Sequence, residues 1–256
     1  LVGNSGNSPY PHLHFQIQAY PYIGSTTLLH PLSGYLKWGA NTPEYIPHGI
    51  PNHGEIVESI QPQSFITSAF HYTSGQKVNF LFSAPNQPDY KDYWIIENDM
   101  YNQTWISEPS SGSKAGFTYI GQVFYFLWYQ GKTDTPLYYF ALAHYRIIPV
   151  VIPGLSLHDK FPLHMMKRNF MFFLNDFIAP FFSFINADYK QYHQKLTSHF
   201  TRPEAILESE ALVKLVGKLI KKYKFYSYLK HDGLAEVRVE SGNGVKIINF
   251  SPSDEA

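Results

Sequence analysis

Two alternating runs of residues late in the sequence are joined by a glycine-rich turn. Residues 235–240 (AEVRVE) and 245–250 (VKIINF) flank residues 241–244 (SGNG). Glycine and asparagine tolerate the positive φ that tight hairpin turns need, so this pattern predicts an antiparallel β-hairpin. The chain also contains 20 Tyr, 20 Phe and 4 Trp. Because aromatic residues favour strands, we expect a fold rich in β-structure rather than a helical bundle.

Length and composition limit the classes of protein that the sequence fits. At about 100–200 residues per domain, the chain forms one large domain or two ordinary ones. Hydrophobic residues make up 44% of the chain, enough for a sizeable core. Acidic and basic side chains number 20 each, and this balance argues against a general nucleic-acid-binding surface. The absence of cysteine excludes disulfides and thiolate metal sites.

Two apolar segments are candidates for membrane spans. Residues 170–187 carry Asp176 and Pro180 near their centre. Residues 136–155 begin with a proline and carry Arg146 and two more prolines. Polar and charged side chains are costly in the hydrocarbon core of a bilayer. We therefore interpret both segments as buried parts of a soluble domain.

The middle of the chain is expected to contain strands. Strands are predicted at residues 78–82, 93–106 and 117–129, with residues 107–116 (SEPSSGSKAG) as a linker. Residues 137–148 fit either a helix or a buried strand.

The later part of the chain is expected to be helical. Residues 170–177 fit a helix that ends before Pro180. Residues 203–223 are the clearest predicted helix, because Pro203 suits a first helical turn and Thr201 suits the cap. One face repeats apolar residues at four-residue spacing, namely Leu207, Ala211, Leu215 and Leu219. Acidic residues come first and basic residues last, as a helix dipole favours: Glu204, Glu208, Glu210, then Lys218, Lys221, Lys222.

Near the start of the chain, His12 and His14 lie on one face of a predicted strand. Residues 12–18 (HLHFQIQ) alternate polar and apolar side chains. Residues i and i+2 of a strand point the same way, about 6.5–7 Å apart, so two imidazoles can reach one small site. Neutral imidazole is a common zinc ligand, and catalytic zinc needs three protein ligands and an open position for water. On spacing alone, however, a solvated polar strand face explains the pair better than a metal site does.

The surrounding residues resemble the end of the catalytic domain of lysostaphin-like (LytM-type) zinc metalloendopeptidases. In that family a turn of the form G-x-[ST]-G leads to a strand reading P-H-L-H-F-[EQ]. Residues 3–6 (GNSG) and 11–16 (PHLHFQ) match this order and spacing. The resemblance covers about the first eighteen residues, with Gln16 where Glu is common.

The resemblance implies a small antiparallel β domain that cuts peptides in bacterial peptidoglycan. It implies that His14 is a zinc ligand and that His12 acts in catalysis, orienting or protonating groups around the attacked carbonyl. The family's other His and Asp ligands come from a motif well upstream of this strand, so we expect the chain to be the C-terminal part of a longer enzyme. Several other residues are expected not to replace them, because they lack the family's spacing: His158, Asp159, His164, His193, His199, His231 and Asp232.

Three roles are open for the residues beyond the resemblance. The first is wall binding by aromatic residues that stack on sugars, although most of them also fit a strand core: Tyr125, Trp128, Tyr129, Tyr138 and Tyr139. The second is a structural or docking domain that uses the helix predicted at 203–223. The third is a second catalytic centre, which no spacing supports, with candidates His144, Asp159, Asp176 and His231.

The sequence therefore predicts a mixed β and α chain. Residues 1–54 would be the end of an antiparallel β peptidase domain with its exit loops, and residues 55–256 a β-rich then helical C-terminal domain. The predicted function is a zinc metalloendopeptidase acting on peptidoglycan peptides outside the cytoplasm, in the periplasm or cell envelope. No nucleic-acid partner is expected, and membrane association would come through sequence outside this chain, for example a urea-transporter-like domain upstream. The alternative is a non-catalytic scaffold that binds the cell wall or a partner and has an incomplete metal site.

Overall fold

The structure is a computed structural model that describes residues 17–162, 165, 185–199 and 202–251. The N-terminal strands are β1 (Ile17–Gln18), β2 (Thr27–Leu28), β3 (Leu32–Trp38), β4 (Pro43–Gly49) and β5 (Ile56–Ser59). The central elements are α1 (Ser64–Ala69), β6 (Lys77–Ser83), β7 (Tyr90–Asn98), β8 (Thr104–Glu108), β9 (Ser113–Ile120), β10 (Val123–Gln130), α2 (Pro136–Ala143), β11 (Arg146–Ile147) and β12 (Ser156–Lys160). The last strands are β13 (Ile185–His199), β14 (Arg202–Leu215), β15 (Lys218–Lys230), β16 (Gly233–Ser241) and β17 (Gly244–Phe250).

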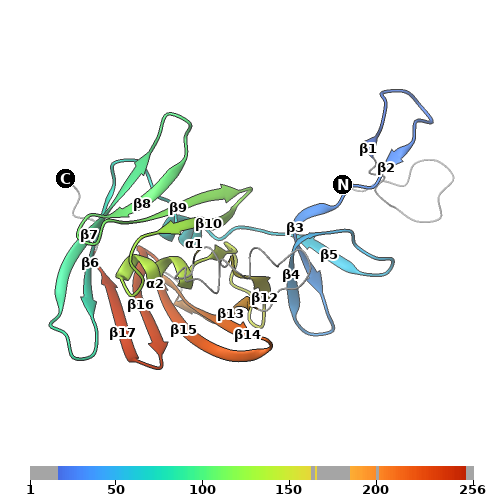
Figure 1. The fold of residues 1–256 in the computed structure, drawn as a ribbon. Helices are drawn as coiled ribbons and strands as arrows, with labels where there is room; N and C mark the ends of the chain where they lie inside the picture. Colours follow the sequence, from blue (N-terminus) through green and yellow to red (C-terminus); the bar gives the residue numbers. More distant parts are fainter. Residues whose placement is uncertain (1–16, 163–164, 166–184, 200–201, 252–256) are drawn as a thin grey trace.

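One sheet of fifteen strands dominates the molecule, and β1 and β2 form a separate pair. The strand order is β11-β10-β9-β8-β7-β6-β17-β16-β15-β14-β13-β12-β4-β3-β5. Neighbours are antiparallel except β12 and β4, which are parallel and meet at the single register pair Ser156 and Glu44. The sheet curls, so that β8–β10 lie over β13–β16 with α2 between the two layers (Figure 1).

Helix α2 forms the axis of the core. The Thr135 side chain caps it by accepting a hydrogen bond from the Tyr138 amide, and Pro136 occupies the first turn. All eight helix residues are buried, and the helix contacts β9 and β10 on one side and β14, β15 and β16 on the other. A helix that is apolar on every side is stable only when both sides are covered, as here.

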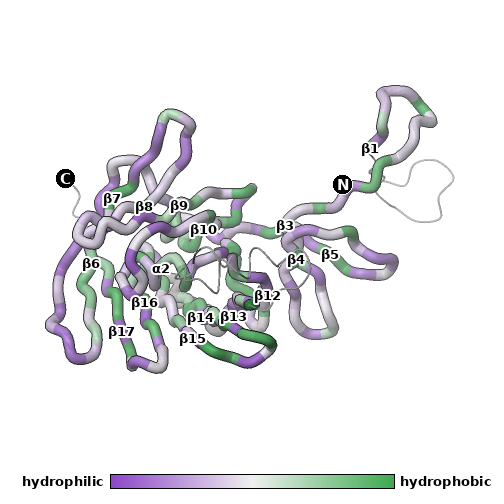
Figure 2. The backbone as a smooth tube through the Cα atoms, viewed as in Figure 1, coloured by the Kyte–Doolittle hydropathy of each residue, from purple (hydrophilic) through white to green (hydrophobic). Residues whose placement is uncertain are grey.

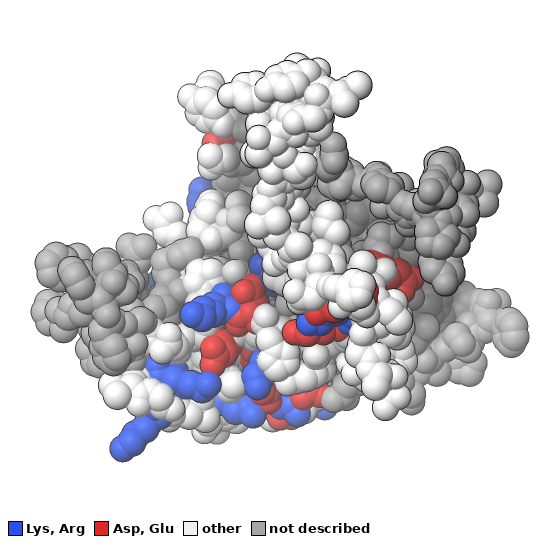
Figure 3. All heavy atoms as spheres, turned by 90° about the vertical axis from the view of Figure 1, so that its right-hand side faces the viewer, with Lys and Arg blue, Asp and Glu red and all other residues white. Residues whose placement is uncertain are grey.

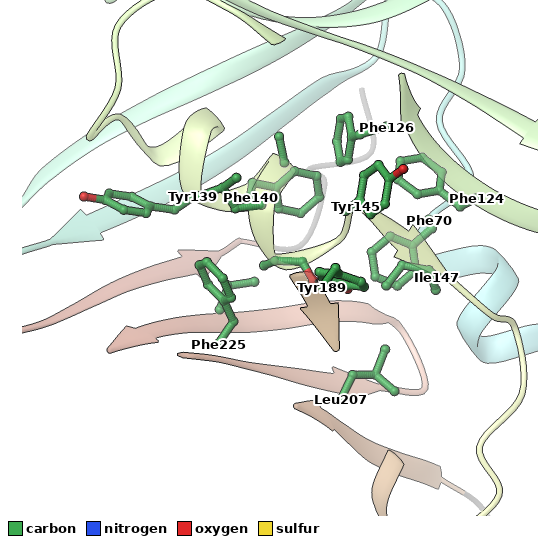
Figure 4. Packing of buried hydrophobic residues seen from close by; sticks show 14 of the residues in the cluster. Phe70, Phe124, Phe126, Tyr139, Phe140, Tyr145, Ile147, Tyr189, Leu207 and Phe225 are labelled. Carbon is green, nitrogen blue, oxygen red and sulfur yellow. Dashed lines mark hydrogen bonds between the residues drawn. The ribbon is translucent and has the colours of Figure 1, made fainter. Parts of the chain in front are cut away.

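Aromatic side chains fill the space around α2. The ring of Phe140 lies 4.8 Å from that of Trp94 on β7 and 5.8 Å from that of Phe126 on β10, measured between centroids. Figure 4 shows Tyr189 and Phe225 reaching toward the same core from the opposite layer. Many of the aromatic residues that the structure describes are thus core residues, and the expected β-rich character is confirmed.

A buried carboxylate joins β8 to the start of α2. Glu108 is 1% exposed, and its Oε1 accepts hydrogen bonds from the Trp94 indole nitrogen and the Leu137 backbone amide, each at 3.1 Å. The Ser111 hydroxyl donates to Oε2 of the same side chain. Leu137 is in the first turn of the helix, where amides lack partners within the helix and the macrodipole favours negative charge. Glu108 therefore acts as a helix cap supplied by a neighbouring strand.

The predicted helical C-terminal domain is wrong. Residues 203–223 belong to β14 and β15, two long antiparallel strands joined at Val216 and Gly217, which both have positive φ. A spacing of four residues keeps side chains on one face of a strand as well as of a helix, since four is a multiple of two. A helix face would also need apolar residues at i+3, where the chain has Glu210 and Lys214 instead.

The order of charges in this region also has a different cause. On the face away from the core, Glu208 pairs with Lys224 at 2.6 Å and Glu210 with Lys222 at 2.7 Å. These are diagonal cross-strand pairs between β14 and β15, so acidic residues precede basic ones because the chain turns back on itself. Figure 3 shows positive and negative side chains interspersed on the lower part of one face.

Other predicted elements are confirmed or corrected locally. The hairpin of residues 235–250 is confirmed as β16 and β17, and the strand at 78–82 lies within β6. Residues 107–116 are not a linker, because they include the end of β8, a short turn and the start of β9. Residues 137–148 are helical as far as Ala143 and then contribute β11.

The N-terminal strands form a small unit at one end of the sheet. β3 pairs with β4 on one side and with β5 on the other, so the predicted boundary between residues 54 and 55 falls between two strands of one antiparallel unit. The helix predicted at 170–177 lies outside the described residues. Within the described ranges, no helix is long and apolar enough to span a bilayer.

Candidate functional site

The two candidate site residues, His12 and His14, lie outside the described residues. The described part of the chain begins directly after their motif, at β1, where Ile17 pairs with Leu28 and Gln18 with Thr27. The last two residues of the predicted strand are therefore in a strand. Among the described residues, no group of three or more His, Cys, Asp or Glu side chains is placed to hold a metal ion.

The β1–β2 hairpin exposes an aromatic pair. Tyr20 and Tyr22 are each 60% exposed, and their rings stack with centroids 5.8 Å apart. Gly24 has a φ of 85° at the turn, and the Ser25 hydroxyl oxygen accepts a hydrogen bond from the Tyr20 amide. Residues 17–30 contain no charged side chain other than the titratable His30, and the projecting upper part of Figure 3 is nearly free of charge. The hairpin offers an uncharged, partly aromatic contact surface close in sequence to His14.

His144 is a core residue and has no access to a substrate. Its Nδ1 lies 3.0 Å from the Phe140 carbonyl oxygen, so Nδ1 carries the proton and donates. Its Nε2 accepts from the Ser227 hydroxyl at 2.8 Å. Burial lowers the pKa of His144 to about 3, partly offset by the bond to Phe140. Both His144 and Ser227 are buried, so this pair stabilises the core and is not a catalytic dyad.

The remaining histidine candidates do not come together. His193 is buried on β13, whereas His158 and His231 are exposed on β12 and after β15. His231 lies 3.7 Å from Asp232, its neighbour in sequence. The side chains of His164, His199 and Asp176 lie outside the part of the chain that the structure describes.

Asp159 forms an ion pair with Arg146 and not with a histidine. Its Oδ2 lies 2.8 Å from a guanidinium nitrogen of Arg146, and this guanidinium stacks 4.6 Å from the centroid of the Tyr125 ring. Arg146 and Asp159 come from β11 and β12, so the pair joins two strands that are not neighbours in the sheet. A largely buried pair of this kind is structural.

Of the five aromatic residues predicted to stack on sugars, two are core residues and three, Tyr125, Trp128 and Tyr129, are half-buried. Tyr138 and Tyr139 on α2 are buried, and the face of Tyr125 is covered by Arg146. The Trp128 ring packs on Gly116, where an added Cβ would lie 2.2 Å from the indole. These contacts leave little free ring face for a sugar.

A groove of about 480 Å³ opens beside the N-terminal end of α2. Its lining includes Asp134, Lys221, Tyr223, Asn243 and Lys246. No sequence pattern indicated this site, because its residues come from three separate parts of the chain. One residue could have indicated the groove from the sequence. Lys246 occupies an inward position of the strand 245–250, two residues before the buried Ile248.

Comparison with protein-family models, curated proteins and solved structures finds no match to the chain. Any functional assignment therefore depends on the residues themselves.

The two buried histidines predict a loss of stability in mild acid. Burial lowers the pKa of His193 to about 4 and that of His144 to about 3, against 6.5 in the unfolded chain. Below pH 6.5 the unfolded state gains protons that the folded state does not, so stability present above pH 6.5 falls as the pH drops toward 4. At pH 5 we expect each histidine to cost about 2 kcal/mol relative to pH 7.5.

Urea unfolding at pH 7.5 and pH 5 measures this effect. The variant His193→Leu should lose roughly half of the pH dependence that the two histidines cause, whereas His30→Leu, at an exposed position, should keep all of it. Equal pH dependence in both variants would contradict the assignment to His193.

Proposed function

We propose that the chain is the C-terminal part of a zinc metalloendopeptidase that hydrolyses peptide bonds in bacterial peptidoglycan, outside the cytoplasm. One observation carries the proposal: the turn at residues 3–6 and the run at residues 11–16 follow the order and spacing of the lysostaphin-like catalytic motif. β1 gives limited support, because its extended residues directly follow the motif.

In this proposal His14 holds the zinc ion and His12 faces the reacting groups. The bound metal would supply a Lewis acid that polarises the scissile carbonyl and lowers the pKa of a bound water. The His12 imidazole would move a proton at the reaction centre or stabilise the developing oxyanion. As the resemblance implies, two further ligands, a His and an Asp, would come from a motif upstream of the strand that carries His12 and His14.

The sheet of β3–β17 would be a separate module carried by the peptidase. Its core is filled, and the histidines that the structure describes in it are buried or scattered. This arrangement fits a positioning or docking role better than a second catalytic centre.

Metal removal tests the proposal. The gene product, expressed with its whole coding sequence, should release soluble peptides from purified peptidoglycan and lose this activity in excess chelator. After the chelator has been removed, zinc added at one equivalent should restore it. Cleavage that persists after the zinc content falls to zero would contradict the proposal. So would a metal-free preparation that binds peptidoglycan but never cleaves it, even after zinc is added, which would indicate the non-catalytic scaffold.

A further inference from the structure

The groove beside α2 contains two lysines that point inward. Along β15, Lys221 has the same strand parity as the buried Tyr223 and Phe225, and along β17 Lys246 has the parity of the buried Ile248. Both ammonium groups therefore project from the core face of the sheet at its open end, whereas other lysines of β15, such as Lys222 and Lys224, have the outer parity.

Two tyrosine side chains contact these lysines, and a carboxylate accepts a hydrogen bond from one of the tyrosines. The Lys246 ammonium donates a hydrogen bond to the Tyr139 hydroxyl at 2.8 Å and lies 4.7 Å from the centroid of its ring. The Tyr139 hydroxyl in turn donates to Asp134 Oδ1 at 2.7 Å. The Lys221 ammonium lies 4.8 Å from the centroid of the Tyr223 ring. These contacts fix the positions of both cations before any ligand arrives, which lowers the entropy cost of binding.

Neither lysine has a carboxylate partner within the described part of the chain. No carboxylate oxygen there lies within 4.0 Å of either ammonium, whereas Lys222 pairs with Glu210 on the outer face. Burial lowers the pKa of Lys246, and the nearby Lys221 lowers it further, while Asp134 acts in the opposite direction. A third lining lysine, Lys222, is neutralised by its pair with Glu210. Lys221, Lys246 and Asp134 then leave the groove a local charge of +1.

The neighbouring surface adds an apolar contact. Ile220 lines the groove and is 56% exposed at the end of the β14–β15 hairpin, which is hydrophobic in Figure 2. A cavity of this volume lies in the range of small-molecule sites, about 300–1,000 Å³, and such sites combine apolar walls with a few fixed polar groups.

We propose that this groove binds a singly charged carboxylate on a small organic molecule or at the end of a peptide, with Lys221 and Lys246 as the contacts. A carboxylate brings the local charge to zero and accepts charge-assisted hydrogen bonds from both ammonium groups. A phosphate dianion would leave an excess negative charge next to Asp134, which favours the carboxylate. Tyr139 is a positioning residue that acts through Lys246. This site is independent of the proposed peptidase activity.

Titration with N-acetylalanine, followed by NMR of labelled protein, tests the proposal. The free carboxylate should bind saturably, whereas N-acetylalanine amide, which lacks the charge, should not. Lys246→Gln and Lys221→Gln should each weaken binding about tenfold or more, the loss of one charge-assisted contact. Lys218→Gln is the matched control, because Lys218 is exposed three residues away and does not line the groove.

A short peptide with a free C-terminal carboxylate, compared with its amide, distinguishes the two sources of the ligand. Tighter binding of the peptide than of N-acetylalanine indicates a peptide end, and equal binding indicates a small molecule. Equal binding of acid and amide would overturn the proposal. Equal weakening by Lys218→Gln and Lys221→Gln would also overturn it, as would the absence of saturable binding in folded protein.

Discussion

Replacement of His14 by alanine is expected to remove bound zinc and to abolish peptide cleavage in the complete gene product. A catalytic zinc site has three protein ligands, and loss of one leaves too few to retain the metal at ordinary zinc concentrations. Without the metal the reaction loses its activated water and its carbonyl polarisation. We expect kcat/KM to fall at least about a thousandfold. This corresponds to three tenfold steps of about 1.36 kcal/mol each in transition-state stabilisation.

Two further variants separate the roles of the histidines. His12→Ala should keep stoichiometric zinc while losing most of the cleavage, because this residue is proposed to act on the substrate and not on the metal. His30→Ala removes an exposed histidine from the same part of the chain and should change neither property. Zinc-dependent cleavage that survives in His14→Ala would refute the assigned role of His14.

Replacement of Glu108 by alanine is expected to cause the largest loss of stability. It would leave the Trp94 indole N–H and the Leu137 amide buried without their acceptor, and would remove the negative charge at the start of α2. Each buried donor without a partner costs about 1–3 kcal/mol, so we expect a total of about 3–5 kcal/mol. This is a large fraction of the stability of a typical domain, about 5–15 kcal/mol.

The chain offers a matched control for this experiment. Glu58 on β5 also accepts a hydrogen bond from a tryptophan indole, that of Trp38, at 2.8 Å, but it is exposed. In Glu58→Ala water replaces the lost acceptor, and the free energy of unfolding should fall by less than about 1 kcal/mol. Urea unfolding followed by tryptophan fluorescence measures both variants, and equal losses would show that burial of Glu108 does not matter.

Local strand patterns could be predicted from the sequence, but the choice between helix and strand could not always be made. The hairpin of β16 and β17 carries its turn residues and its alternation together, so two signals agree. In β14, the four-residue spacing of Leu207, Ala211 and Leu215 satisfies both periods, whereas Leu219 lies past the turn on β15. These residues form strands because β14 pairs with β13 and β15 pairs with β16. Such tertiary contacts cannot be read from a short stretch of sequence.

The two candidate sites also differ in how far the sequence alone could predict them. The His12 and His14 pair is contiguous, so its order and spacing are visible in the amino-acid sequence alone. The groove of Lys221 and Lys246 depends on the meeting of β15, β17 and the start of α2, together with Asp134. The sequence signals only the inward position of Lys246, and the fold is needed to show that Lys221 points into the same groove.

The pairing of β6 with β17 determines when the sheet can form during synthesis of the chain. These two strands lie side by side at the centre of the sheet, with Phe80 opposite Phe250, although they are far apart in sequence. Until residue 250 has left the ribosome, β6 has an open edge and the two halves of the sheet cannot join. The sheet therefore closes only once β17 has emerged, and a nascent chain stopped before β17 would expose an unpaired strand edge to chaperones and to other chains.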